Sequence, residues 1–163
     1  MVAEWQTNRT IYQGTGHDIY ITMRLYLDTN ILAFLITGQK DEICRSVSDK
    51  LADYSNLFLV SSVCVQELIH LRQIGKLSFR KGTSSVTQSL ILAWLDEMGI
   101  DVVGVNKKHL QQYSELPLFS DHRDPNDRLI IAQAISDRIP LISSDHKFAN
   151  YEQYGLELIF NER

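Results

Sequence analysis

Five acidic residues, spread over most of the chain, have the side-chain type and the positions needed to bind a metal ion. They are Asp28, Glu67, Asp124, Asp127 and Asp145. Oxygen-only ligands favour Mg²⁺ or Mn²⁺, which bind through a few carboxylates and keep several of their waters. We therefore expect a divalent-cation site, provided that these residues meet in the folded chain.

Two of these acids lie on helical stripes that should face the core. Glu67 is flanked at helical spacing by four apolar residues: Val63, Cys64, Leu71 and Ile74. Asp127 has three such neighbours: Ile130, Ile131 and Ala134. Burying an unpaired carboxylate is strongly unfavourable. Two acids in such positions therefore indicate function rather than chance.

Every candidate acid except Glu67 also has a purely structural interpretation. Asp28 suits the turn after a strand. Asp124 suits a helix N-cap before Pro125, with Asp127 as an acid near the helix dipole. Asp145 suits the cap of a short helix that begins at His146. These interpretations stay open beside the functional one.

Crowded carboxylates predict both the cation and the chemistry. Two charges about 4 Å apart repel by about 4 kcal/mol at an effective dielectric of 20, so a cluster needs a neutralising ion. Such an ion activates water and neutralises charge on a phosphodiester. We expect metal-assisted phosphodiester hydrolysis, with Arg123 and Arg128 either meeting phosphate or forming structural ion pairs. His122 is expected to be an exposed loop residue rather than a substrate contact.

Short apolar strands alternate with helical segments along the chain. The expected strands are 24–27, 57–60, 101–105, 140–142 and 156–160. The expected helices are 31–36, 41–54, 61–74, 86–98, 106–117 and 125–138. This alternation predicts an α/β fold, in three layers with a mainly parallel sheet. Ligands of such sheets bind beyond the carboxyl ends of the strands, where Asp28 and Asp145 are expected.

Composition sets few limits on function. The 163 residues suit one domain, and 44% hydrophobic with 22% charged residues is ordinary for a globular protein. Two scattered cysteines, with no signal-peptide core and no apolar run of membrane-spanning length, predict a cytoplasmic protein. The net charge of −4 is unusual for a nucleic-acid binder. Removing five metal-bound negative charges leaves +1, so charge neither supports nor excludes such a substrate.

Four segments, taken in order, resemble the PIN-domain family, and more closely the VapC-type toxins of bacterial toxin–antitoxin pairs. The segments are 25–30, 61–71, 122–134 and 141–145, and the similarity extends from about Met23 to Phe160. The segment 122–134 is the most specific, because its acids, proline, arginine and small-residue helix follow the family's order. Ser143 stands where the family often has threonine, and it keeps the hydroxyl group.

The resemblance implies a five-stranded parallel sheet flanked by helices and an Mg²⁺- or Mn²⁺-dependent endoribonuclease. It implies that the catalytic metal ligands are Asp28, Glu67, Asp127 and Asp145, with Asp124 as a candidate fifth. The candidate substrate contacts are Asn30, Ser143, Arg123 and Arg128. An RNA substrate, an antitoxin partner and a homodimer are also implied.

Residues 1–22 lie outside this resemblance, which assigns the nuclease domain to 23–163. Either translation begins at Met23, or Ile19 to Ile21 lengthen the first strand.

Three other functions compete with the ribonuclease. A non-catalytic RNA-binding or scaffolding domain need not keep every acid. A phosphoacceptor receiver domain needs paired acids after the first strand and a late lysine, which Asp28-Thr29-Asn30 and Ser143-Ser144 do not provide. A DNA nuclease would need a helical arch or an added DNA-binding module, and the sequence indicates neither.

Overall fold

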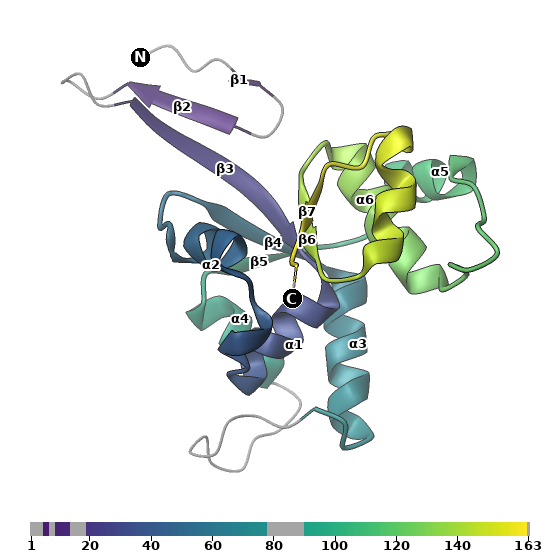
Figure 1. Ribbon diagram of the computed structural model, residues 1–163, viewed down its shortest axis with the longest axis horizontal. Coiled ribbons are helices and arrows are strands. Elements are labelled where there is room, and N and C mark those ends of the chain that lie inside the picture. The colour runs from purple at the N-terminus through teal and green to yellow at the C-terminus, as the bar shows by residue number, and fades with distance from the viewer. Residues whose placement is uncertain (1–4, 7–8, 14–18, 78–89, 163) are drawn as a thin grey trace.

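The computed structural model describes residues 5–6, 9–13, 19–77 and 90–162, with only the backbone described before Thr22. Five parallel strands form the body in the order β5–β4–β3–β6–β7 (Figure 1). The strands are β3 (Ile19–Leu27), β4 (Leu57–Ser61), β5 (Ile100–Val103), β6 (Leu141–Ser143) and β7 (Leu158–Phe160). The predicted α/β class and the five-stranded parallel sheet are confirmed.

An antiparallel ribbon extends this sheet at its N-terminal side. Strand β2 (Arg9–Gln13) pairs with the first half of β3, and β1 (Trp5–Gln6) pairs with β2. Figure 1 shows the ribbon projecting from the body. Strand β3 begins at Ile19, as the second hypothesis for the extension expected. The other hypothesis, that translation begins at Met23, stays a prediction.

Helices cover both faces of the parallel sheet (Figure 1). On one side lie α1 (Thr29–Thr37), the 3-10 turn η1 (Lys40–Glu42), α2 (Arg45–Ala52) and α4 (Leu90–Glu97). On the other lie α5 (Lys107–Glu115), α6 (Pro125–Asp137) and the 3-10 helix η2 (His146–Tyr154). Helix α3 (Ser62–Gln73) follows β4 directly and contacts both α1 and α6. No helix among the described residues is long and apolar enough to cross a bilayer.

Local signals explain where most helices begin. Ser61 accepts a hydrogen bond from the backbone of Val63 and caps α3. Asn106 and His109 form a reciprocal capping box at α5. Asp124 caps α6, with Pro125 in its first turn. Side chains at these positions satisfy backbone N–H groups that have no partner within the helix.

Two predicted helices differ from the observed ones. The helix expected over 41–54 is split, because 40–42 form the 3-10 turn and α2 starts only at Arg45. The helix expected over 86–98 is observed as α4 from Leu90, and its predicted start lies outside the described residues.

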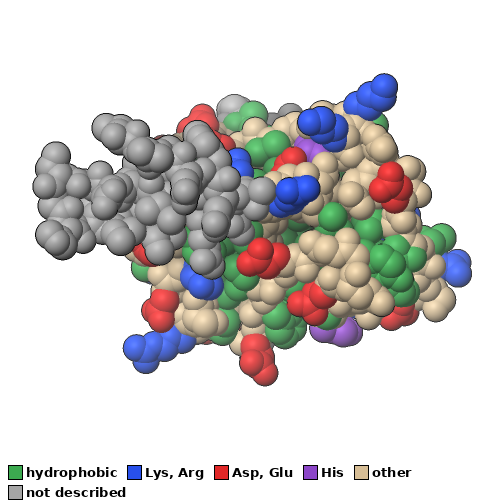
Figure 2. All heavy atoms as spheres, turned by 90° about the horizontal axis from the view of Figure 1, so that it is seen from above, with side chains coloured by type: hydrophobic (Ala, Val, Ile, Leu, Met, Phe, Trp, Pro, Cys, Tyr) green, Lys and Arg blue, Asp and Glu red, His purple; other side chains and the backbone are tan. Residues whose placement is uncertain are grey.

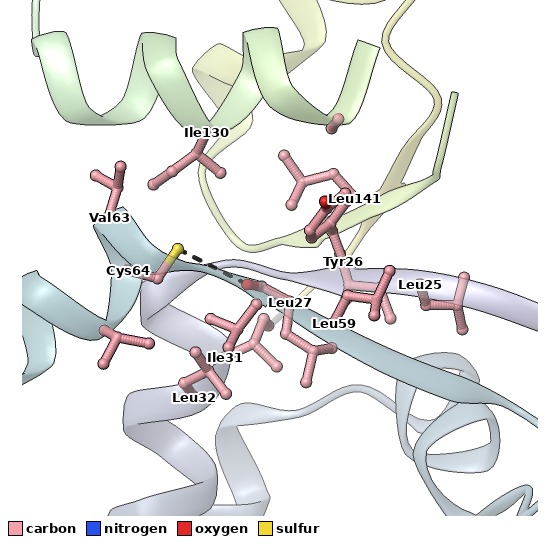
Figure 3. Close-up of a cluster of buried hydrophobic side chains, with 14 of the residues drawn as sticks. Leu25, Tyr26, Leu27, Ile31, Leu32, Leu59, Val63, Cys64, Ile130 and Leu141 are labelled. Atoms are coloured by element: carbon pink, nitrogen blue, oxygen red, sulfur yellow. Dashed lines mark hydrogen bonds between the residues drawn. The ribbon is translucent and has the colours of Figure 1, made fainter. Parts of the chain in front are cut away.

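The core lies between β3, α1, α3 and α6. Consecutive residues of β3 point to opposite faces of the sheet. Tyr26 points toward Leu141 and α6, whereas Leu27 points toward Ile31 of α1 (Figure 3). The Sγ atom of Cys64 lies 3.9 Å from the carbonyl oxygen of Leu27, which ties α3 to the end of β3. This packing fixes the ends of the strands that carry the acidic residues.

Candidate active site

Two acidic residues follow neighbouring strands at the carboxyl edge of the sheet. Leu27 of β3 pairs with Ile142 of β6. The next residues, Asp28 and Ser143, therefore stand side by side where both strands end. Asp145 comes two residues later, at the N-cap of η2. Sequence reasoning expected this edge, and the register of the two strands sets the contact.

Asp28 is buried yet held by several donors. Its Oδ1 accepts from the backbone N–H of Thr29 at 2.7 Å. Its Oδ2 accepts from the Ser143 hydroxyl at 2.6 Å and from the Asn30 amide at 2.7 Å. Asn30 in turn accepts from the backbone N–H of Ser144 at 3.2 Å. Two of the predicted substrate contacts, Asn30 and Ser143, therefore orient an acid in this structure.

Glu67 reaches the same region from α3. Its Oε2 accepts a hydrogen bond from the Thr29 hydroxyl at 2.5 Å. Thr29 follows Asp28 directly, so α1 and α3 bring their carboxylates together at one point. Thr29 was not predicted as part of the site, although its place within Asp28-Thr29-Asn30 is a signal that was available.

Asp127 stands in the first turn of α6 and faces the other acids. Ligand atoms of His122, Asp127 and Asp145 all lie within 4.8 Å of one another. The two carboxylates at this spacing offer oxygen donors to one divalent cation, and the imidazole lies beside them. The site therefore has two sides: Asp28 with Ser143, and Asp127 with His122.

The pKa values of two carboxyls, Asp28 and Asp127, are raised by burial and by neighbouring acids. Burial raises the pKa of Asp28 to about 6, although hydrogen bonds from Ser143 and Thr29 lower it. Burial also raises the pKa of Asp127 to about 7. The charges of four other acids add to this rise: Asp28, Asp124, Glu67 and Asp145. The four other candidate ligands therefore all lie within electrostatic reach of Asp127.

His122 corrects one prediction. It was expected to be an exposed loop residue, but it is only 3% exposed. Its Nε2 lies 3.3 Å from Asp127 Oδ2, and its Nδ1 lies 3.0 Å from the Tyr151 hydroxyl. Burial lowers the pKa of His122. No local signal marks this burial, because the covering residues Phe148 and Tyr151 come from η2.

Arg128 was expected either to meet phosphate or to form a structural ion pair, and its side chain is buried. Its guanidinium is buried between α5 and α6, where it donates to the Tyr113 hydroxyl at 3.1 Å and to the Leu116 carbonyl at 3.0 Å. It also stacks over the Tyr113 ring, 4.6 Å from the ring centre. This geometry gives Arg128 a structural role in holding α5 against α6.

The remaining predicted contacts lie at the rim of the site. Asp124 is exposed and caps α6 through the backbone N–H groups of Asn126 and Asp127. Arg123 is exposed beside it. On the face drawn in Figure 2, Lys and Arg side chains lie apart from one another, with acidic and uncharged side chains between them.

A comparison with known families agrees with this arrangement. A profile of the PIN domain matches residues 25–153, a range that holds all the candidate site residues. The chain belongs to the PIN domain family. No curated protein matches it in sequence.

Solved structures of similar fold include two VapBC structures and a toxin–antitoxin complex. The VapBC2 structure from Rickettsia felis, bound to a promoter DNA fragment, has 20% identity and a TM-score of 0.60, covering 86% of this chain and 100% of that one. VapBC-1 from nontypeable Haemophilus influenzae has 22% identity and a TM-score of 0.56, covering 85% and 98%. A toxin–antitoxin complex from Klebsiella pneumoniae has 15% identity and a TM-score of 0.58, covering 85% and 98%. At these identities the similarity shows a shared fold and nothing more.

Proposed function

We propose that this PIN-domain chain is a divalent-cation-dependent endoribonuclease and the toxin of a toxin–antitoxin pair. The observation that carries the proposal is the cluster of acids around Asp127. Ligand atoms of Asp127 and Asp145 lie within 4.8 Å of each other, and the charges of Asp28, Glu67, Asp124 and Asp145 raise the pKa of the Asp127 carboxyl. Carboxylates crowded in this way are stabilised in their charged form by a cation. Oxygen donors of this kind suit Mg²⁺ or Mn²⁺.

The side chains that would hold the cation are those of Asp28, Asp127 and Asp145, with Glu67 acting directly or through water and Asp124 at the rim. A bound divalent cation supplies positive charge that stabilises the transition state of phosphodiester hydrolysis. The chain's own residues orient the carboxylates: Ser143 and Asn30 hold Asp28, and the Thr29 hydroxyl holds Glu67. We propose that Arg123, which is exposed, meets the phosphate backbone of the substrate.

The proposed partner is a protein antitoxin. The VapBC and toxin–antitoxin structures that share this fold over most of the chain support this class of partner. A homodimer and the RNA substrate remain predictions from the family resemblance. A cytoplasmic location remains a prediction from the two scattered cysteines.

The deciding experiment is cleavage of RNA by the purified chain with Mn²⁺, with Mg²⁺ and with EDTA. We expect cleavage only with a cation, and its loss in Asp28→Asn and in Asp127→Asn. The matched control is Asp96→Asn, which removes the same charge from an exposed position of α4. Expression of the wild-type chain in a bacterium should arrest growth, whereas expression of Asp28→Asn should not.

Two outcomes would contradict the proposal. Cleavage that persists in Asp28→Asn or Asp127→Asn would remove the acidic cluster from the reaction. A folded wild-type chain that binds neither Mn²⁺ nor Mg²⁺ would favour the alternative, a non-catalytic RNA-binding or scaffolding domain.

A further inference from the structure

We infer that His122 is a positioning residue for Asp127, held in place by the Tyr151 hydroxyl, and that this pair sets the affinity of the acidic cluster for its cation. The inference rests on the proposed function, because it concerns the same cation. It assigns a role to a buried histidine and tyrosine that the family resemblance left without one.

The direction of the hydrogen bonds follows from Asp127. An ionised carboxylate can only accept, so Nε2 of His122 carries the ring proton and donates to Asp127 Oδ2 at 3.3 Å. In the neutral imidazole Nδ1 then accepts, and the Tyr151 O–H, 3.0 Å away, donates to it.

Packing fixes the imidazole in this orientation. The ring of His122 lies edge-on to Phe148, with centres 5.6 Å apart, and to Tyr151, with centres 5.5 Å apart. Phe119 packs edge-on against the same Tyr151 ring at 5.1 Å. A buried ring enclosed by other rings cannot turn freely, so its Nε2–H has a fixed target.

The consequence concerns Asp127. A carboxylate has about four lone-pair sites, so donation to Oδ2 orients the group and still leaves sites for a cation. Residues that orient metal ligands in this way typically change metal affinity by about 10- to 100-fold when they are substituted.

Two substitutions of His122 separate positioning from packing. In His122→Gln the amide group reaches about where Nε2 stands, and it can still donate to Asp127. In His122→Asn the amide lies near Nδ1 and can meet only Tyr151. Tyr151→Phe keeps both ring contacts and removes only the hydroxyl that orients His122.

The experiment is calorimetric titration of each full-length variant with Mn²⁺, in the absence of RNA, beside thermal unfolding in EDTA. We expect His122→Asn to weaken Mn²⁺ binding about 10-fold or more, and His122→Gln to stay within about 3-fold of wild type. Tyr151→Phe should fall between them. The two His122 variants should unfold at similar temperatures, since both lose the ring.

Equal losses of affinity in His122→Gln and His122→Asn, or no loss in either, would overturn the inference. So would a directly bound imidazole nitrogen in the pulsed EPR spectrum of the Mn²⁺ complex, because Nε2 would then be a ligand rather than a donor to Asp127. Failure of the wild-type chain to bind Mn²⁺ would instead contradict the proposed function, which keeps the two failures distinct.

Discussion

The two sides of the acidic site hold their carboxylates in different ways. Asp28 is only 3% exposed, but three donors surround it and its pKa is about 6. The Asp127 side chain is 27% exposed, yet its pKa is about 7, with His122 as its hydrogen-bond partner and four acids acting on it. Hydrogen bonds to a charged carboxylate thus offset much of the cost of burial. The α6 side, with fewer donors, depends more on the cation.

The largest effect should come from removing the cation. Both carboxyls have a folded-state pKa above the ordinary value of 3.8, so the folded chain holds protons that the unfolded chain has lost. Stability in EDTA should therefore fall as the pH rises from about 4 to 7, by about 3 kcal/mol from Asp28 alone. Urea unfolding followed by circular dichroism at several pH values measures this loss.

Mn²⁺ should restore most of that stability at pH 7.5, and Asp28→Asn should flatten the slope measured in EDTA. Asp96→Asn serves as the control and should leave the slope unchanged. An equally steep slope in Asp28→Asn would mean that other groups produce it.

A smaller effect should follow from removing one of the hydrogen bonds that hold Asp28. Ser143→Ala removes the hydroxyl that donates to Asp28 and that accepts from the backbone N–H of Asp145 at 3.0 Å. We expect a pKa of Asp28 above about 6 and a loss of about 1–3 kcal/mol in the free energy of unfolding. Carbon-detected NMR titration and urea unfolding measure the two changes.

The neighbouring Ser144→Ala provides the control for that experiment. The Ser144 hydroxyl bonds to Asn161, not to Asp28, so this variant should leave the pKa of Asp28 in place. A similar rise in both variants would point to a general loosening of the segment 143–145.

The coupling between the two sides can be measured directly. Among the charges that raise the pKa of Asp127, that of Asp28 has the largest effect. Asp28→Asn removes this charge, so the pKa of Asp127 should fall below about 7. NMR titration of the Asp127 carboxyl carbon without divalent cations reports it. An unchanged pKa of Asp127 would mean that the charge of Asp28 does not act on it, and that the two sides are independent.

Asp124→Asn should have the smallest effect. Asparagine caps a helix about as well as aspartate, so the free energy of unfolding should change by less than about 0.5 kcal/mol. The pKa of Asp127 should fall by less than in Asp28→Asn, because Asp124 ranks after Asp28 among its charge partners. A larger fall than in Asp28→Asn would mean that Asp124 acts on Asp127 more strongly than Asp28 does, and that Asp124 belongs to the centre of the site rather than to its rim.

Much of the fold could be predicted because its signals are local. Caps at Ser61, Asn106 and Asp124 mark helix starts, and short apolar runs mark the parallel strands. The predicted helix over 41–54 was wrong at its start, because apolar spacing does not distinguish a 3-10 turn from an α-helix. The first half of β3 belongs to a ribbon whose partner strand no local spacing identifies.

The candidate site was predictable only in part. Acids on apolar stripes, at Glu67 and Asp127, were informative because burying such a group is costly without a partner. Arg128 shows the limit: its charge indicates that a partner exists, but its sequence neighbours do not show that the partners are Tyr113 and the Leu116 carbonyl.

The sequence alone determined the α/β class, the caps and the acids expected at the carboxyl edge, because each depends on residue type and spacing over a few turns. Tertiary structure decided how those acids are held. The strand register sets Ser143 beside Asp28, and rings from η2 enclose His122 against Asp127. Burial and hydrogen-bond direction depend on groups far apart in the chain, and these fix the pKa of each carboxyl.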